Sequence, residues 1–313
     1  MAKYILTVTL NPVLDYMAKP PRFSLGHDSY LPEFALSAGG KGLNVSRALK
    51  SFHVPTRATG FIGGAAGSLI GDMLSKENIR HDFIKIPQET RKSITIIDLA
   101  SSPITRVIEE GPTVSPASQK LFLRKFRSLL TNGRWAVMSG RLPAGIPESF
   151  YGDLINMAQA RGLKTVLDTT GKFFQIGLQS SPFLIKPNRE EAESFLGRKL
   201  NHSAQIKNAM QHFLKFGVKI VLISLGAKGA AATDGKDYWL AKASQVKVTN
   251  TVGCGDAMIA GFLYSYDRGQ DLAQSLKTAV AAGTANCLSL RPGEIDRKQV
   301  LTLMKRVKLQ RLK

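Results

Sequence analysis

One stretch in the last quarter of the chain places glycines and an acidic residue directly before an apolar run. Asn250–Asp256 reads NTVGCGD and continues as AMIAGFL. Helical periodicity begins at once, so the amides of Gly253, Cys254 and Gly255 are expected at a helix N-terminus, without partners inside the helix. Such a turn binds anions, most naturally phosphate. Asp256 beside it could accept a proton from an attacking hydroxyl. The alternative is an acid that only complements the helix dipole.

A second group of glycines surrounds a lysine. Ser37–Arg47 reads SAGGKGLNVSR, in which backbone amides could approach a ligand and Lys41 could lie beside an anion. The spacing of a Walker A loop is absent, and Gly60–Gly67 lacks the G-x-G-x-x-G pattern of dinucleotide-binding turns. A glycine-rich turn with a solvated lysine is the alternative.

Other polar residues permit two interpretations each. Asp15 follows the first predicted strand, where it could hydrogen-bond a polyol or serve as a turn residue. Asn188 and Glu191 have the spacing of a capping box, although their oxygens could also hold hydrated Mg²⁺. Arg91 is either a solvated edge charge or a contact to an anionic substrate beneath a lid. Arg141 is either a solvent-facing turn residue or part of a phosphate clamp.

Two further segments could form the wall of a binding site. Ser224–Ala230 reads SLGAKGA, which suits a hairpin turn or a backbone surface against a nucleotide. The small residues of Thr278–Asn286 permit either tight helix packing or approach to a flat base. Ser139 lies in SGRLPAG, which does not match the G-x-S-x-G elbow of serine hydrolases.

These residues need a scaffold, and alternating patterns predict one. Short apolar strands are expected at Tyr4–Leu10, Trp135–Ser139, Thr165–Asp168, Phe183–Lys186 and Ile220–Leu225. Helices are expected at about 43–53, 66–77, 117–131, 147–161, 189–196 and 203–217, and an amphipathic helix with a basic tail is expected to close the chain. This alternation predicts a three-layer, doubly wound α/β domain that binds ligands at the carboxyl ends of its strands. Extended segments at about 15–37 and 83–110 predict a small β-sheet lid, inserted in a single domain spanning 1–313.

Composition excludes several classes of protein. The 313 residues are 43% hydrophobic and 21% charged, as is ordinary for a globular protein. No apolar run approaches the ~18 residues of a membrane span, the first ten residues suit a strand better than a signal peptide, and the two cysteines have no zinc spacing. A cytoplasmic protein without membrane partners is expected. The net charge of +20 raises nucleic acid as a partner, but the basic residues are scattered and no nucleic-acid-binding motif is present, so that role is not expected.

The motifs in this order resemble the PfkB-type, ribokinase-like sugar kinases, and within them the branch of 1-phosphofructokinase and tagatose-6-phosphate kinase. The resemblance spans essentially the whole chain and implies a three-layer fold with a β-lid, ATP and Mg²⁺ as cofactors, and a homodimer formed through the lids. It implies Asp256 as the catalytic base and the Gly253–Gly255 amides as an anion hole. The sugar-phosphate contacts that it implies are Asp15, Gly39, Gly40, Lys41, Asn44, Arg91 and Ser139. The implied nucleotide contacts are Lys186, Asn188, Ser224, Gly226, Ala227, Gly229, Gly255 and Asn286, with Asn188 and Glu191 as the metal-associated pair.

Three departures from that branch stand out. Arg141 replaces a common serine, no basic residue occurs near His27–Tyr30 in the lid, and Cys254 replaces the usual alanine or serine. The resemblance predicts phosphorylation of a ketohexose phosphate, with fructose 1-phosphate favoured and tagatose 6-phosphate or fructose 6-phosphate as alternatives. A non-catalytic sugar-phosphate sensor and a nucleic-acid-binding protein are the alternatives from other classes. Arg141, with Lys41 and Arg91, is predicted to clamp the sugar phosphate in place of the missing lid residue.

Overall fold

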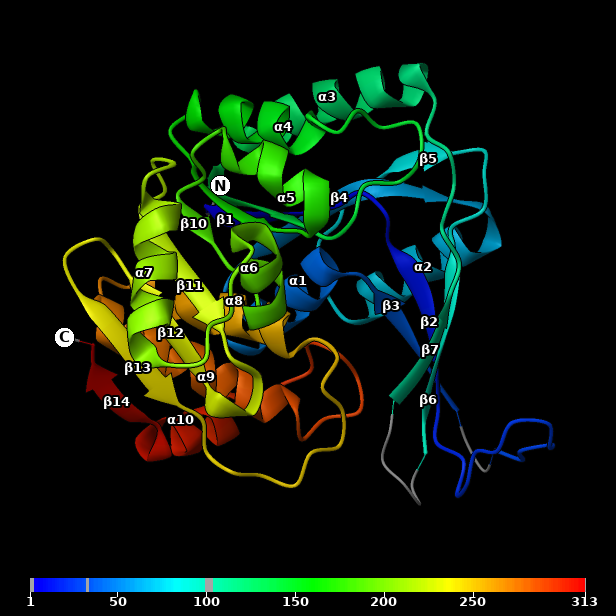
Figure 1. Ribbon diagram of the computed structural model, residues 1–313. Coiled ribbons are helices and arrows are strands. Elements are labelled where there is room, and N and C mark those ends of the chain that lie inside the picture. The colour runs from blue at the N-terminus through cyan, green and yellow to red at the C-terminus, as the bar shows by residue number, and fades with distance from the viewer. Residues whose placement is uncertain (1–2, 32–33, 99–103, 313) are drawn as a thin grey trace.

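The computed structural model describes residues 3–31, 34–98 and 104–312, and it divides their strands between a large sheet and a small one (Figure 1). The large sheet has the order β14-β13-β12-β11-β10-β9-β8-β1-β4-β5. Its strands are β1 Tyr4–Thr9, β4 Thr56–Gly63, β5 Ile84–Ile86, β8 Gly133–Ser139, β9 Lys164–Asp168, β10 Leu184–Ile185, β11 Ile220–Ser224, β12 Ala230–Thr233, β13 Tyr238–Lys242 and β14 Lys308–Arg311. Pairing is parallel from β5 to β11 and antiparallel from β11 to β14.

Helices cover both faces of this sheet and give three layers, as predicted (Figure 1). One face is covered by α3 Pro116–Leu130, α4 Phe150–Gln159, α5 Gly171–Leu178, α6 Arg189–Leu196 and α7 Ser203–Leu214. The other face is covered by α1 Lys41–Ser51, α8 Cys254–Tyr266, α9 Leu272–Asn286 and α10 Arg297–Arg306. Alternate residues of one strand enter opposite cores: Leu6 of β1 packs with the first set of helices and Ile5 with the second.

Local sequence sets where several helices begin and end. Ser115 accepts a hydrogen bond from Ser118 N ahead of α3, and Pro116 occupies the first helical position, where its missing N–H costs nothing. Asn188 and Glu191 form the predicted capping box at the start of α6, and that helix ends at Gly197 with φ 63°. Helix α8 is apolar on all sides because α1 and α9 enclose it.

The small sheet, here called the lid sheet, projects from one end of the large one (Figure 1). It has the order β3-β2-β6-β7, with β2 Val13–Ala18, β3 Phe34–Gly39, β6 Lys92–Ile97 and β7 Ile104–Ile108. Helix α2 Gly64–Lys76 packs beneath β2, β3 and β4. Strands β6 and β7 fall within the predicted lid segments, whereas β2 begins two residues before the first segment and β3 ends two residues after it. Within these segments, 32–33 and 99–103 lie outside the described residues.

The structure corrects three of the predictions and contains elements that were not predicted. The basic tail is not a continuation of the closing helix: α10 ends at Arg306, and β14 pairs with β13 in the large sheet. Residues 84–86, expected in the lid, form β5 and pair with β4. Asp15 lies within lid strand β2 and does not end the first strand. Strand β4 and helix α5 were not predicted, because their glycine-rich sequences resemble loops.

Candidate active site

Polar side chains from distant parts of the chain meet at the carboxyl edge of the parallel strands. Asp168 ends β9, Lys186 follows β10, and the first turn of α8 lies beside them. Loops that leave this edge of a parallel sheet form the usual ligand site of doubly wound folds. The sequence motifs are therefore brought together as predicted.

Asp256 lies in the first turn of α8 with only 4% of its surface exposed. Its Oδ2 accepts a hydrogen bond of 2.8 Å from Nδ2 of Asn44 on α1. The Oδ1 of Asn44 accepts in turn from the guanidinium of Arg47, at 3.3 Å. Because Arg47 can only donate, this contact fixes which end of the Asn44 amide faces Asp256.

Arg47 is buried, with only 5% of its surface exposed, and several groups hold its guanidinium in place. Its guanidinium donates to the carbonyls of Pro292 (2.8 Å) and Ala38 (2.9 Å), and it pairs with Glu77 at 2.7 Å. A buried cation with all of these partners has little freedom to rotate. Arg47 therefore anchors Asn44 to the framework behind the site.

The start of α8 has the geometry of an anion-binding turn. Gly253 caps the helix with φ 85°, and a side chain there would meet Pro292. The first helical hydrogen bond runs from Ala257 N to Gly253 O at 2.9 Å, so the amides before Ala257 find no partner within the helix. One expectation needs amending: Cys254 N donates a long bond of 3.4 Å to Thr251 O and is not wholly unpaired.

A buried ion cluster lies next to this turn. Asp168 Oδ1 is 3.2 Å from Lys41 Nζ and 3.4 Å from Lys186 Nζ. A Cβ on Gly255 would lie 2.9 Å from Lys186 Nζ, so the absence of a side chain at Gly255 lets the ammonium reach the turn. Burial alone would raise the pKa of Asp168, but the two lysines outweigh it and hold that pKa below its ordinary value.

The pKa of Asp256 is shifted in the opposite direction, above its ordinary value. Burial, and then repulsion from Asp168, raise the pKa of Asp256 to about 6, although Lys41, Asn44 and Lys186 oppose the shift. The pKa of Lys41 is lowered by burial, but attraction to Asp168 and Asp256 raises it above its ordinary value. At neutral pH the site therefore holds an ionised Asp256 beside a protonated Lys41. A carboxylate with a pKa near neutrality is suited to taking a proton from a bound hydroxyl.

The lid sheet presents a second polar group to this region. Asp15 of β2 is 3% exposed, and its Oδ1 accepts hydrogen bonds from the hydroxyls of Ser93 and Thr95 on β6. Its Oδ2 lies 4.0 Å from a guanidinium nitrogen of Arg106 on β7. Thr95 and Arg106 are directly paired across β6 and β7, on the face that carries Asp15. Sequence reasoning did not identify Arg106.

Arg91 lies where the lid sheet joins the main body. Its guanidinium donates to the carbonyls of Asn11 (2.9 Å) and Pro12 (3.3 Å), so it is not a freely solvated charge. Burial, and then repulsion from Arg106 and Arg141, lower the pKa of Arg91. Three guanidinium groups therefore gather here with one carboxylate, Asp15. Lys41 interacts with Asp168, Asp256 and Glu191, and its part in the predicted phosphate clamp with Arg91 and Arg141 stays a prediction.

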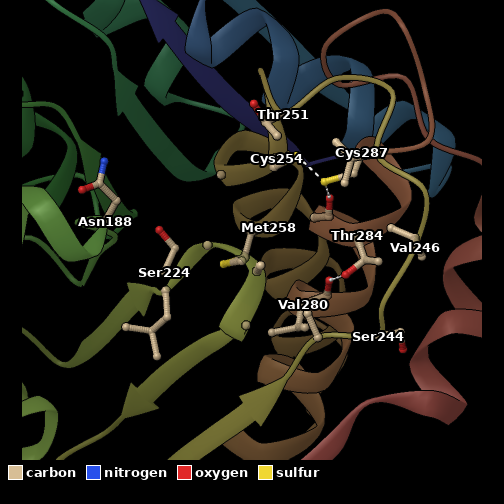
Figure 2. Close-up of a pocket in the computed structure, with 18 of the residues that line it drawn as sticks. Asn188, Ser224, Ser244, Val246, Thr251, Cys254, Met258, Val280, Thr284 and Cys287 are labelled. Carbon is tan, nitrogen blue, oxygen red and sulfur yellow. Dashed lines mark hydrogen bonds between the residues drawn. The ribbon is translucent and has the colours of Figure 1, made fainter. Parts of the chain in front are cut away.

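A cavity of about 820 Å³ opens on the other side of the α8 turn (Figure 2). Its walls are the β11–β12 turn, the loop after β13 and the facing sides of α8 and α9. The predicted residues Asn188, Ser224, Gly226, Ala227, Gly229 and Gly255 line it. The tight packing predicted for the small-residue helix is confirmed, since Ala282 packs against Gly261 of α8. Gly283 borders the cavity, and the approach of this helix to a flat base stays a prediction.

Two predicted nucleotide contacts lie outside this wall. Lys186 and Asn286 are not among the described residues that line the cavity. Lys186 is buried between Asp168 and Gly255. The amide of Asn286 donates to Val252 O (2.8 Å) and accepts from Gly293 N (2.7 Å), so it braces the loop that leads into α8.

The remaining predicted residues are mostly held by backbone packing. Side chains at Gly39 and Gly40 would collide with Val13 and Thr9, so these glycines let the loop pass over the end of β1. Ser139 ends β8, and its buried Oγ has no hydrogen-bond partner among the described residues. Arg141 is exposed two residues further on.

Sequence reasoning missed two kinds of residue. Asp168 was identified only as the end of a strand, although a charged residue that ends a buried strand at the carboxyl edge is a usable signal. Val246 and Val248 line the cavity from the loop after β13, in a part of that loop that carries no recognisable motif. No local pattern could have identified these two.

Comparison with known proteins agrees with this geometry. A model of the pfkB family of carbohydrate kinases matches residues 8–296. The chain is similar to the 1-phosphofructokinase of Borreliella burgdorferi, with 36% identity over 91% of this chain and 92% of the relative. It is also similar to a tagatose-6-phosphate kinase of Staphylococcus epidermidis, with 32% identity over 97% and 99% of the two chains.

Solved structures extend the similarity to the fold. Phosphofructokinase-2 from Escherichia coli in complex with substrates and products superimposes with a TM-score of 0.91 at 25% identity, over 97% of this chain and 99% of that one. Its tetrameric inhibited form superimposes with a TM-score of 0.87 over the same shares, also at 25% identity. The similarity therefore covers the large sheet and the lid sheet together.

Proposed function

The chain belongs to the pfkB family of carbohydrate kinases, and we propose that it phosphorylates a ketohexose phosphate, with fructose 1-phosphate favoured, to give a 1,6-bisphosphate. The observation that carries the proposal is the position of Asp256. It lies at an anion-binding helix start whose residues Cys254 and Gly255 line the 820 Å³ cavity, and its partner Asn44 belongs to α1, which directly follows lid strand β3. We infer that a phosphoryl donor in the cavity and a hydroxyl acceptor beneath the lid can both reach this residue.

In the proposed reaction, ATP occupies the cavity with its γ-phosphate at the first turn of α8. The acceptor oxygen forms a bond to the γ-phosphorus while the bond from that phosphorus to the β–γ bridging oxygen breaks. The hydroxyl proton passes to the carboxylate of Asp256, and ADP leaves. Transfers of this kind need mainly positioning and charge stabilisation, which the helix-start amides and Lys41 supply.

The donor set beside the turn is compatible with Mg²⁺. Asp168 Oδ2 is buried without a hydrogen-bond partner among the described residues, and the carboxylate of Glu191 lies nearby, close enough to raise the pKa of Lys41. Within the described chain, no three His, Cys, Asp or Glu residues form a metal cage. Mg²⁺ retains several waters and binds through few carboxylates together with substrate phosphates, which this arrangement fits. Asn188 and Glu191 would hold it through water, and it would neutralise charge on the transferred phosphoryl group.

The acceptor is proposed to lie beneath the lid sheet. Asp15 would bind a sugar hydroxyl, while Arg91, Arg106 and Arg141 would grip the acceptor's own phosphate. Guanidinium groups bind phosphate through paired, charge-assisted hydrogen bonds. Arg106 thus offers the lid cation that was not found near His27–Tyr30.

The acceptor's identity is tested by comparing kcat/KM for fructose 1-phosphate, tagatose 6-phosphate and fructose 6-phosphate with ATP and Mg²⁺. All three carry a phosphate at one end and a hydroxyl at the other. We expect the highest value for fructose 1-phosphate. A higher value for either of the others would replace that acceptor but keep the enzyme class. A preference for unphosphorylated sugars, or no turnover at all, would refute the proposal and favour the sensor alternative.

The outer face of the lid sheet supports a homodimer. Tyr16, Phe34, Ile94 and Val107 lie on the face opposite Asp15, and Phe34 and Val107 are 61% and 62% exposed. Exposed apolar faces of this kind mark interaction surfaces. Val107→Glu should convert the dimer to a monomer in sedimentation experiments, whereas Leu301→Glu, on exposed α10, should not. A wild-type monomer at micromolar concentration would contradict this assembly.

No helix within residues 3–31, 34–98 and 104–312 combines the length and apolar character that a bilayer crossing requires.

A further inference from the structure

The only two cysteines in the sequence lie against each other at the edge of the proposed active site. Cys254 is the first residue of α8 and Cys287 immediately follows α9, and their Sγ atoms are 2.9 Å apart (Figure 2). The other hydrogen-bond contacts of the two thiols are longer: Asn286 Nδ2 lies 3.4 Å from Cys254 Sγ, Cys254 Sγ lies 3.9 Å from Asn250 O, and Cys287 Sγ lies 3.4 Å from Gly283 O. The proposed phosphoryl transfer uses neither thiol.

Small oxidants can reach the pair. Both cysteines are only partly buried, and both line the 820 Å³ cavity rather than a closed core. Figure 2 shows the two side chains on adjacent helices, directed toward each other at one end of that cavity. Cysteines become reactive when they are accessible and can form thiolates.

The two thiols differ in acidity. A hydrogen bond from Cys254 lowers the pKa of Cys287, because the shared proton stabilises the Cys287 thiolate. The same hydrogen bond, followed by burial, raises the pKa of Cys254. The two Sγ atoms are close enough that, whichever thiol is oxidised first, its partner can resolve it.

We propose that Cys254 and Cys287 form a reversible disulfide, a covalent modification site whose oxidant is hydrogen peroxide. The thiolate of one cysteine attacks an oxygen of the peroxide, the O–O bond breaks, and that cysteine becomes a sulfenic acid while the leaving hydroxide takes up a proton and departs as water. The other thiol then attacks the sulfenic sulfur, and the hydroxide that leaves takes the thiol's proton as a second water while the S–S bond forms. Two thiols are oxidised, one peroxide is reduced to two waters, and added dithiol reverses the change by exchange.

The disulfide would alter the anion-binding turn; this part of the inference rests on the proposed function. An S–S bond is about 2.05 Å long, so the sulfurs must approach by roughly 0.9 Å. Cys254 belongs to the turn whose amides face the γ-phosphate, and the bond would tie that turn to the end of α9. A misplacement of about 1 Å near a reacting centre can lower turnover by about 10²-fold. We expect oxidation to lower kcat at least tenfold, and dithiothreitol to restore it.

The chemistry is tested without any activity assay. The folded protein is treated with hydrogen peroxide, and its free thiols and intact mass are then measured. We expect free thiols to fall from two per chain to none, with a mass loss of about 2 Da for the two hydrogens. The Tm should rise, because the bond closes a loop across 33 positions of the unfolded chain. The intramolecular disulfide would be refuted if two free thiols remained after treatment. It would also be refuted if the mass rose by added oxygen, or if a non-reducing gel showed disulfide-linked dimers.

Activity is compared within each protein, before and after oxidation. Wild type should lose turnover and recover it with dithiothreitol, whereas Cys287→Ala and Cys254→Ala should keep their own starting activity. Both variants retain Met258 in the same cavity, so loss through methionine oxidation would appear in them and would not be reversed by dithiothreitol. A disulfide that leaves wild-type turnover unchanged would overturn the effect on the site. An enzyme inactive toward every sugar phosphate would refute the proposed function, while thiol count and mass would still decide the disulfide.

Discussion

Asn44 Nδ2 donates a 2.8 Å hydrogen bond to Asp256 Oδ2, and this contact joins helix α1 to helix α8 at the centre of the site. It orients the carboxylate that we propose as the base. It also offsets part of the burial and repulsion that raise the pKa of Asp256. The position and the pKa of the Asp256 carboxylate thus both depend on the side-chain amide of Asn44.

Asp256→Asn should lower kcat by roughly 10²–10⁴, the usual contribution of a general base, while nucleotide binding persists. Steady-state kinetics and nucleotide titration measure the two effects. Asp153→Asn is the matched control, because Asp153 is also an acid in the first turn of its helix but is exposed. Equal, small effects of the two substitutions would mean that Asp256 serves only the helix dipole.

The pH dependence of kcat/KM should show an acid limb near the pKa of Asp256, about 6. The base must be ionised, so the rate should rise with pH through this value and level off above it. The hydrogen bond from Asn44 lowers that pKa, so Asn44→Ala should move the limb to higher pH. If the acid limb stays at the same pH in Asn44→Ala, the limb does not report the titration of Asp256.

The contribution of Asp256 to the free energy of unfolding should change with pH in the opposite direction to activity. The pKa of Asp256 is higher in the folded chain than in the unfolded one, so its contribution favours folding at low pH and is lost as pH rises through about 6. Asp256→Asn should therefore raise the Tm at pH 7.5, by the equivalent of roughly 1–3 kcal/mol. The gain should shrink between pH 6 and 4, and thermal unfolding across this range measures it. A gain independent of pH would assign the effect to packing.

Arg47→Met should lower kcat about tenfold through Asn44, in addition to destabilising the fold by about 3 kcal/mol as a buried ion pair is broken. The test is a double-mutant cycle: once Asn44 is alanine, removing Arg47 should have little further effect on kcat. Arg291→Met is the control, since Arg291 also pairs with Glu77, and no contact joins it to Asn44 in the described structure. Additive losses in kcat would contradict a positioning role.

Arg141→Ser should raise KM for the sugar phosphate about tenfold or more and leave KM for ATP nearly unchanged, because it removes one cation of the proposed phosphate clamp. Initial-rate kinetics with each substrate varied in turn distinguish the two constants. Arg161→Ser, an exposed arginine after α4, serves as the control. An unchanged sugar-phosphate KM would leave Arg141 as a surface residue.

The fold was predictable because its strands are buried on both faces. Runs such as Ile220–Ile223 are apolar throughout, and motifs that follow such runs must meet at one edge of the sheet. The tail was wrongly predicted because residues 305–313 continue a helical apolar pattern; pairing with β13 decides their conformation, and that strand is distant in sequence. Tertiary pairing overrides local periodicity in such edge strands.

Within the site, motif residues could be predicted and their partners could not. Nothing near Arg106 in the sequence indicates that Asp15 lies across two strands from it. The capping box at Asn188 could be predicted because both partners lie within one helical turn. The cysteine pair shows the same limit, since 33 positions separate two residues whose sulfurs touch.

The separation of Asn44 and Asp256 by 212 positions also has a meaning for synthesis on the ribosome. Translation proceeds at about 5–20 residues per second, so roughly 10–40 s pass between the emergence of the two residues. During that interval β1, β4 and the lid strands can already pair, but the nascent chain lacks Asp256 and the anion-binding turn. A polypeptide that ends before residue 256 would therefore lack the proposed base and the turn that faces the phosphate, even where its lid strands had already paired.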